Sequence, residues 1–163
     1  MKTRKLSKSW KGSLIGLLFL FAGIGSIPSV QAQSSGQTLN INGKGFGDVT
    51  ATSTTGFIVG AGILNGTTKA TFTDIPKPSG GGLLDVDPRT VSYVATLVIT
   101  TKRGCVTTQD VGIFDTLNGK FSSVSRVIGG TGRFKGATGF LFFHGDVRDG
   151  RFIDEISGEI ELP

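Results

Sequence analysis

The sequence predicts an all-β fold, a single antiparallel β-barrel of about eight strands. Apolar and polar residues alternate with a period of two from about residue 43 to the end of the chain, as in half-buried strands. Turn residues interrupt this alternation at intervals of about 8 to 12 residues, the spacing of strands in sandwiches and barrels. Threonine and valine are plentiful, and strong helix formers are few. Closure into a barrel would remove the unpaired sheet edges of so β-rich a chain.

The first 32 residues have the order of a Sec signal peptide. A basic region at residues 2–11 precedes an apolar run at 14–27, and Val30-Gln31-Ala32 fits a small-x-small cleavage site. The apolar run is shorter than the about 20 residues that a membrane-spanning helix needs. We therefore expect cleavage after residue 32, export to the periplasm or the extracellular space, and no stable membrane insertion afterwards. An uncleaved membrane anchor is the alternative.

The chain after residue 32 is predicted to divide into a flexible segment, 33–42, and a barrel domain, 43–163. Five of the 17 basic residues and none of the 12 acidic ones lie in the leader, so the remainder has no net charge. The excess of basic residues therefore gives no reason to expect nucleic acid as a partner. With one Tyr and no Trp, this part lacks the aromatic girdles of an outer-membrane barrel. The single cysteine, Cys105, is expected to be a buried small hydrophobe rather than a reactive thiol.

The first hairpin is predicted over residues 57–75, closed by Asn65-Gly66, a preferred pair for a two-residue type I′ turn. This register sets Val59 opposite Phe72 on an apolar face. The Pro- and Gly-rich loop that follows, 76–88, is the longest connection of the domain. It is either a functional lid or a solvated linker.

Two more hairpins are predicted from their turn residues. One joins 91–101 to 105–115 through Arg103-Gly104, and its register sets Tyr93 opposite Phe114 and Leu97 opposite Asp110. The other spans 140–162 through Asp149-Gly150 and sets Val147 opposite Phe152. Between them, a strand over 121–128 follows the Asn118-Gly119 turn.

These registers place two acidic residues, Asp110 and Asp154, among inward-facing apolar ones. A carboxyl group buried beside an apolar cavity has a raised pKa and can serve as a general acid or a charge stabiliser. The alternative is that each carboxylate is hydrogen-bonded by the backbone or by a Thr and only fixes the core. The residues predicted to line a ligand site are Tyr93, Leu97, Asp110, Phe114, Phe143 and Asp154.

The most distinctive segment is 129–139, Gly-Gly-Thr-Gly-Arg-Phe-Lys-Gly-Ala-Thr-Gly. Its five glycines predict a sharp turn with positive φ at several points, and Phe134 is expected to plug one end of the barrel. A phosphate-binding loop would open a helix, whereas the residues that follow alternate like a strand. The residues assigned to this structural turn are Gly129, Gly130, Thr131, Gly132, Phe134 and Gly136.

This segment resembles the signature of the allene oxide cyclase and dirigent family of β-barrels. The resemblance implies an apolar barrel interior: allene oxide cyclases steer the cyclisation of a fatty-acid epoxide with an interior Glu, and dirigent proteins orient phenoxy radicals with interior acids. No Glu lies on a strand face that we place inward, which leaves Asp110 and Asp154 as the candidate acids. The resemblance also implies trimers that associate through outer barrel faces.

The outer face supports the same expectation of assembly. Phe140 and Phe142 fall on the face opposite the predicted core, and an exposed aromatic patch suggests a covered surface, so we expect a homo-oligomer, a trimer first of all. A terminal segment that folds over the patch in a monomer is the alternative. His144, the only histidine, is expected to be a surface residue paired with Glu155. No multi-histidine metal site can therefore form, and we expect neither a metal nor a cofactor.

Three functions remain open: binding of a small apolar molecule in the barrel, an isomerase or cyclase that uses shape and one buried acid, and a structural or surface-interaction module with a filled barrel. An apolar interior with a few placed polar groups favours binding, although a filled core has the same sequence. An enclosed interior void of a few hundred Å³ would favour the first two, and a solid interior the third.

Overall fold

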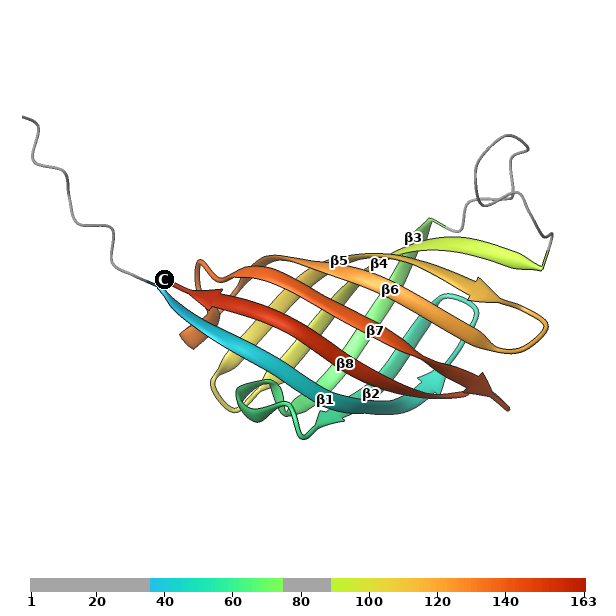
Figure 1. Ribbon diagram of the computed structural model, residues 1–163, viewed down its shortest axis with the longest axis horizontal. Coiled ribbons are helices and arrows are strands. Elements are labelled where there is room, and N and C mark those ends of the chain that lie inside the picture. The colour runs from blue at the N-terminus through green and yellow to red at the C-terminus, as the bar shows by residue number, and fades with distance from the viewer. Residues whose placement is uncertain (1–35, 75–88) are drawn as a thin grey trace, which may run out of the picture. The chain divides into compact units, whose positions relative to one another are not determined.

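The computed structural model describes residues 36–74 and 89–163, and this part of the chain forms a closed antiparallel barrel of eight strands (Figure 1). Each strand pairs with the next in the sequence, and the first pairs with the last. The predicted all-β barrel is therefore confirmed. The strands are β1 (Gln37–Val49), β2 (Ser53–Val59), β3 (Gly66–Asp74), β4 (Thr90–Thr101), β5 (Gly104–Asp115), β6 (Lys120–Gly130), β7 (Thr138–Arg148) and β8 (Arg151–Leu162).

Two short 3-10 helices lie in connections between strands: η1 (Gly62–Leu64) between β2 and β3, and η2 (Gly132–Phe134) between β6 and β7. No helix among the described residues is long and apolar enough to cross a membrane. The strand pairings and the hydrophobic core that the structure describes lie within residues 36–74 and 89–163. The predicted leader, 1–32, and the predicted loop, 76–88, lie outside the described residues.

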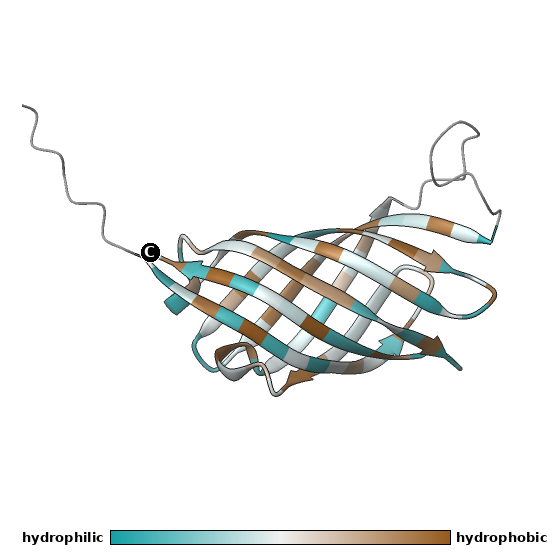
Figure 2. Ribbon diagram, in the orientation of Figure 1, coloured by the Kyte–Doolittle hydropathy of each residue, from teal (hydrophilic) through white to brown (hydrophobic). Residues whose placement is uncertain are grey.

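Alternation between the two barrel faces follows the predicted period of two. Apolar and polar positions alternate along the strands in Figure 2, and buried residues alternate with exposed ones in β5, β6 and β8. In the last hairpin Val147 lies opposite Phe152, as predicted from the Asp149-Gly150 turn. Asp149 and Gly150 both have positive φ, 52° and 74°, as this kind of tight hairpin requires.

The β4–β5 register differs from the prediction by two residues. Tyr93 lies opposite Gly112 rather than Phe114, and Leu97 lies opposite Thr108 rather than Asp110. The cause is at the turn: the Thr101 hydroxyl accepts a hydrogen bond from the Arg103 N–H (3.0 Å) and donates one to the Gly104 carbonyl (2.9 Å), so the turn falls one residue earlier. A shift of two leaves every side chain on its predicted face.

The predicted β2–β3 hairpin is wrong. The chain leaves β2 at Val59 and makes the η1 turn, in which Asn65 accepts a hydrogen bond from the Ala61 N–H through its side-chain oxygen (2.8 Å). Asn65 therefore fixes a wider connection instead of a two-residue turn. The register changes by an odd number, so the faces of β2 are reversed: Ile58 is buried, while Phe57 and Val59 are 50% and 43% exposed.

The predicted flexible segment is also wrong where the structure describes it. Residues 37–42 belong to β1 and pair with residues 157–162 of β8. The sequence sign of this strand is a short alternation of apolar and polar residues, in which Leu39 and Ile41 face the core. Residues 33–35 lie outside the described residues.

One end of the barrel is filled, and the glycine segment closes it. Gly132 and Gly136 take positive φ, 59° and 77°, and η2 carries Phe134 into the core, where it is fully buried. The Thr131 hydroxyl accepts a hydrogen bond from the Cys105 N–H (3.0 Å), which ties the turn to β5. Gly129 and Gly130 stay in β6. The other fully buried apolar side chains are Leu64, Ile99, Val106, Leu141 and Ile160.

Candidate ligand-binding site

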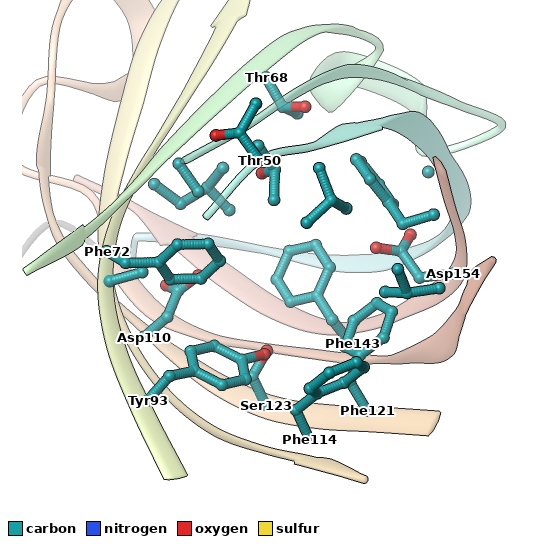
Figure 3. A pocket seen from close by; sticks show the side chains of 18 of the residues that line it. Thr50, Thr68, Phe72, Tyr93, Asp110, Phe114, Phe121, Ser123, Phe143 and Asp154 are labelled. Atoms are coloured by element: carbon teal, nitrogen blue, oxygen red, sulfur yellow. The ribbon is translucent and has the colours of Figure 1, made fainter. Parts of the chain in front are cut away.

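The other half of the barrel is hollow. A cavity of about 260 Å³ lies toward the end that carries the β1–β2, β5–β6 and β7–β8 turns, and its wall takes residues from all eight strands (Figure 3). The apolar wall residues include Val49, Ile58, Ala70, Val91, Ala95, Leu97, Val147 and Ile156.

All six residues predicted to line a ligand site lie in the wall of this cavity: Tyr93, Leu97, Asp110, Phe114, Phe143 and Asp154. Their inward direction did not depend on the misplaced β4–β5 register, because a two-residue shift preserves the faces. Whether they bind a ligand remains a prediction. The structure adds wall residues that the sequence did not single out, notably Gly45, Phe121 and Ser123.

Six aromatic rings surround the cavity, and glycines on neighbouring strands make room for two of them. The Tyr93 ring lies over Gly112, where an added Cβ would collide with it. The Phe152 ring lies over Gly47 in the same way. Such close approach requires the absence of a side chain. Phe72 and Tyr93 make an edge-to-face contact with ring centroids 5.5 Å apart. The remaining rings are Phe114, Phe121 and Phe143.

The Tyr93 hydroxyl reaches across β5 toward Ser123 on β6, and the two lie beside each other in Figure 3. Burial raises the pKa of Tyr93 to about 12; the Ser123 hydrogen bond opposes this shift, and the charges of Asp110 and Asp154 add to it. The hydroxyl is therefore protonated at neutral pH and can donate a hydrogen bond within the cavity.

Asp110 is 6% exposed and has a defined partner. The Thr108 hydroxyl donates a hydrogen bond of 2.6 Å to its Oδ1 atom. Burial raises the pKa of Asp110, while the hydroxyls of Thr108 and Ser125 oppose the shift. Ser125 lies directly opposite on β6, but its hydroxyl does not meet hydrogen-bond geometry with any described residue. A hydrogen bond from a Thr is what we expect if the Asp110 carboxylate only fixes the core.

Asp154 is equally buried, but one of its oxygens has no partner. Its neighbours in register are two glycines, Gly45 on β1 and Gly145 on β7. Its Oδ1 atom is buried without a hydrogen-bond partner among the described residues. Burial raises the pKa of Asp154 to about 6; the Gly45 N–H and the charge of His144 oppose the shift. In Figure 3 the carboxylate points into the cavity. Of the two acids, Asp154 is the one with free bonding capacity.

The remaining candidates lie outside the cavity. His144 and Glu155 form a surface pair (3.4 Å), as predicted, with both side chains more than half exposed. Cys105, expected to be buried, is half-buried, and its thiol contacts the Thr100 hydroxyl at 3.6 Å. The described residues contain no group of three His, Cys, Asp or Glu side chains that could hold a metal ion.

No protein-family model matches this chain, and a comparison with curated proteins found no match. Among solved structures, the chain is similar to the pterocarpan synthase dirigent protein GePTS1, at 18% sequence identity. The alignment covers 83% of this chain and 94% of that one, with a TM-score of 0.33.

Proposed function

We propose that this barrel, exported and cleaved after residue 32, binds a small apolar molecule in its hollow half. The observation that carries the proposal is the cavity of about 260 Å³. Protein interiors are close-packed, so a barrel filled along its whole length would not leave an apolar hollow of this size, partly open to solvent, between its strands. Apolar walls with a few convergent polar groups are the usual composition of a ligand site.

The test compares the same substitution in the two halves of the barrel. Ala70 lies in the cavity wall, whereas Ala61 is buried in the filled half, beside Gly43. We expect Ala70→Leu to occupy the cavity and weaken ligand binding while leaving the fold stable. Ala61→Leu should instead destabilise the fold by about 1–3 kcal/mol through overpacking. Binding that is unaffected by Ala70→Leu would place the ligand elsewhere.

Ligands can be found in two ways. Native mass spectrometry of the protein from its own host detects a co-purified molecule. Titrations can use Tyr93, because a chain of residues 33–163 contains this one Tyr and no Trp, and Tyr93 lies in the cavity wall. Its fluorescence therefore reports on the cavity and on no other place.

An isomerase or cyclase is a second candidate, and Asp154 is the observation that favours it. A carboxyl group with a pKa of about 6 in an apolar cavity is suited to general acid catalysis near neutral pH. Analysis of the ligand before and after incubation separates the two functions: recovery of an isomer supports catalysis, and recovery of the unchanged molecule supports binding.

We further propose that the barrel assembles as a homo-oligomer, a trimer first of all. The supporting feature is an outer apolar ridge of directly paired residues on four adjacent strands: Val94, Val111, Val124 and Phe142. Phe140 and Phe142 are 49% and 47% exposed in the single chain. A continuous apolar ridge on an outer face is typical of a covered surface.

A further inference from the structure

The Asp154 carboxylate has bonding capacity that the described residues do not fill. The side chain is 6% exposed, and Oδ1 has no hydrogen-bond partner. Leaving a buried charged group unsatisfied costs the full desolvation of that atom. Oδ1 itself is covered by Gly45, whereas the carboxylate as a whole points into the cavity, so a ligand meets its cavity-facing side (Figure 3). A ligand in the cavity can provide the missing donor.

The cavity has negative charge and nothing among its described wall residues to balance it. Asp110 and Asp154 both belong to the wall, and none of the described wall residues is Lys, Arg or His. Neither carboxylate is within ion-pair distance of a basic side chain of the described residues. A positive charge brought into such a low-dielectric space interacts with these carboxylates more strongly than it would in water.

The aromatic rings suit the same kind of charge. Phe72, Tyr93 and Phe143 lie between or beside the two carboxylates in Figure 3. The faces of aromatic rings attract cations, and cages of aromatic rings are the usual means by which proteins recognise ammonium groups. The wall therefore combines carboxylates and aromatic rings with apolar surface for the rest of a ligand.

We propose that the cavity takes an amphiphilic amine, a small apolar molecule with a protonated ammonium group that donates a hydrogen bond to the Asp154 carboxylate. This inference rests on the proposed binding function and names the class of ligand. The competing chemistry is a neutral ligand whose carbonyl or hydroxyl oxygen accepts a bond from a protonated Asp154.

The effect of pH separates these two chemistries. A cation requires the ionised carboxylate, so amine binding weakens as the pH falls below about 6, where Asp154 takes up a proton. A ligand that accepts from the protonated acid binds better on the acid side. The other charged or titratable groups around Asp154 are Tyr93 from β4, Asp110 from β5, and the outer-face residues Lys44, His144 and Glu155 of β1, β7 and β8.

The experiment uses residues 33–163 and three head groups on two skeletons. The probes are the amine, the alcohol and the carboxylate of an adamantylmethyl skeleton and of a linear octyl skeleton. Calorimetry gives the affinities, and Tyr93 fluorescence reports whether the cavity is occupied. We expect each amine to bind about tenfold or more tightly than the matching alcohol at about pH 7.5, as a charge-assisted hydrogen bond provides. The carboxylates should bind weakest.

Asp154→Asn should remove the preference for the amine and leave the alcohol bound. Glu155→Gln is the matched control, because this neighbouring acid faces solvent and its loss should not change the preference. Equal affinities of amine and alcohol, or a preference that survives Asp154→Asn, would overturn the inference and leave the binding function standing. If none of the six probes binds, both proposals are overturned.

Discussion

Gly45 and Asp154 face each other across the β1–β8 pair, and the carboxylate of one occupies the space where the other would carry a Cβ. The three nearest atoms to an added Cβ at Gly45 all belong to the Asp154 carboxyl group. This glycine therefore sets the position of the buried acid. Gly45 does not have positive φ, so its backbone conformation does not require glycine. Glycine is needed here because the carboxyl group approaches the backbone closely.

Gly45→Ala should destabilise the protein by about 1–3 kcal/mol, because the carboxyl group must move within a buried space. In the background of Asp154→Ala the same substitution should be tolerated, so a double-mutant cycle should give a coupling of about 1 kcal/mol or more. Gly47→Ala is the control, since its added Cβ would meet the Thr55 carbonyl and the Phe152 ring instead. Additive effects at Gly45 and Asp154 would contradict this relationship.

The free energy of unfolding should depend on pH through Asp154. Its pKa is raised from 3.8 to about 6 in the folded state, so the folded protein holds the proton more tightly. The resulting stabilisation is complete below about pH 4 and falls by about 3 kcal/mol as the pH rises through about 6. The difference between the wild type and Asp154→Asn should follow this curve in denaturant titrations across the range.

A second acid on the surface provides a control of opposite sign. The pKa of Asp115 is lowered, first by the Asn118 side chain and then by backbone N–H groups. Its contribution to stability is therefore present above its ordinary pKa and is lost as the pH falls. The difference between the wild type and Asp115→Asn should shrink on acidification. A curve of the same sign for both variants would contradict the assignment to Asp154.

Tyr93 should ionise well above the ordinary pKa of tyrosine. Burial raises its pKa from 10.0 to about 12, and the charge of Asp110 contributes. Because Tyr93 is the single tyrosine of the chain, tyrosinate absorbance reports on it alone. The stability of the folded state should decline between about pH 10 and about pH 12, and Asp110→Asn should lower the midpoint. A midpoint near 10 in folded protein would show that the ring is solvated.

Assembly should depend on the ridge that contains Phe142. Phe142→Asp should convert the oligomer to monomers at micromolar concentration, because it places a charge within an apolar contact. Ile153→Asp is the matched control: Ile153 is 58% exposed on the outer face of β8 and pairs with Phe46 and Asp146, away from the ridge. Sedimentation measures both. A monomeric wild type would reject the proposed assembly.

The fold was predictable where short turns determine the register. Asp149-Gly150 is a true two-residue turn, so the pairing of β7 with β8 followed from the sequence. Asn65-Gly66 gave the same local signal, but the Asn65 side chain bonds to Ala61 and makes a different connection. Sequence alone does not distinguish an Asn that occupies a turn from one that holds a longer loop together.

The site was predictable in part for a related reason. Asp110 and Asp154 could be placed inside because each alternates with inward apolar residues. A register error of an even number of residues does not change the face on which a side chain lies. Ser123 could not be assigned to a face, since serine and apolar residues occur on both faces of β6. Gly45 carried no sign of its role, because the need for its missing side chain comes from a residue more than a hundred positions away in β8.

The pairing of β1 with β8 also determines when the protein can fold. Twelve pairs join residues 37–48 to residues 151–162, so the ladder that closes the barrel links the two ends of the domain. A chain still emerging from the ribosome cannot form this ladder until β8 has been synthesised, and contacts so distant in sequence form slowly. The nascent chain therefore stays unfolded for longer than one built from local contacts. Under the proposed export, this delay would keep the chain in the unfolded form that a membrane translocon can pass.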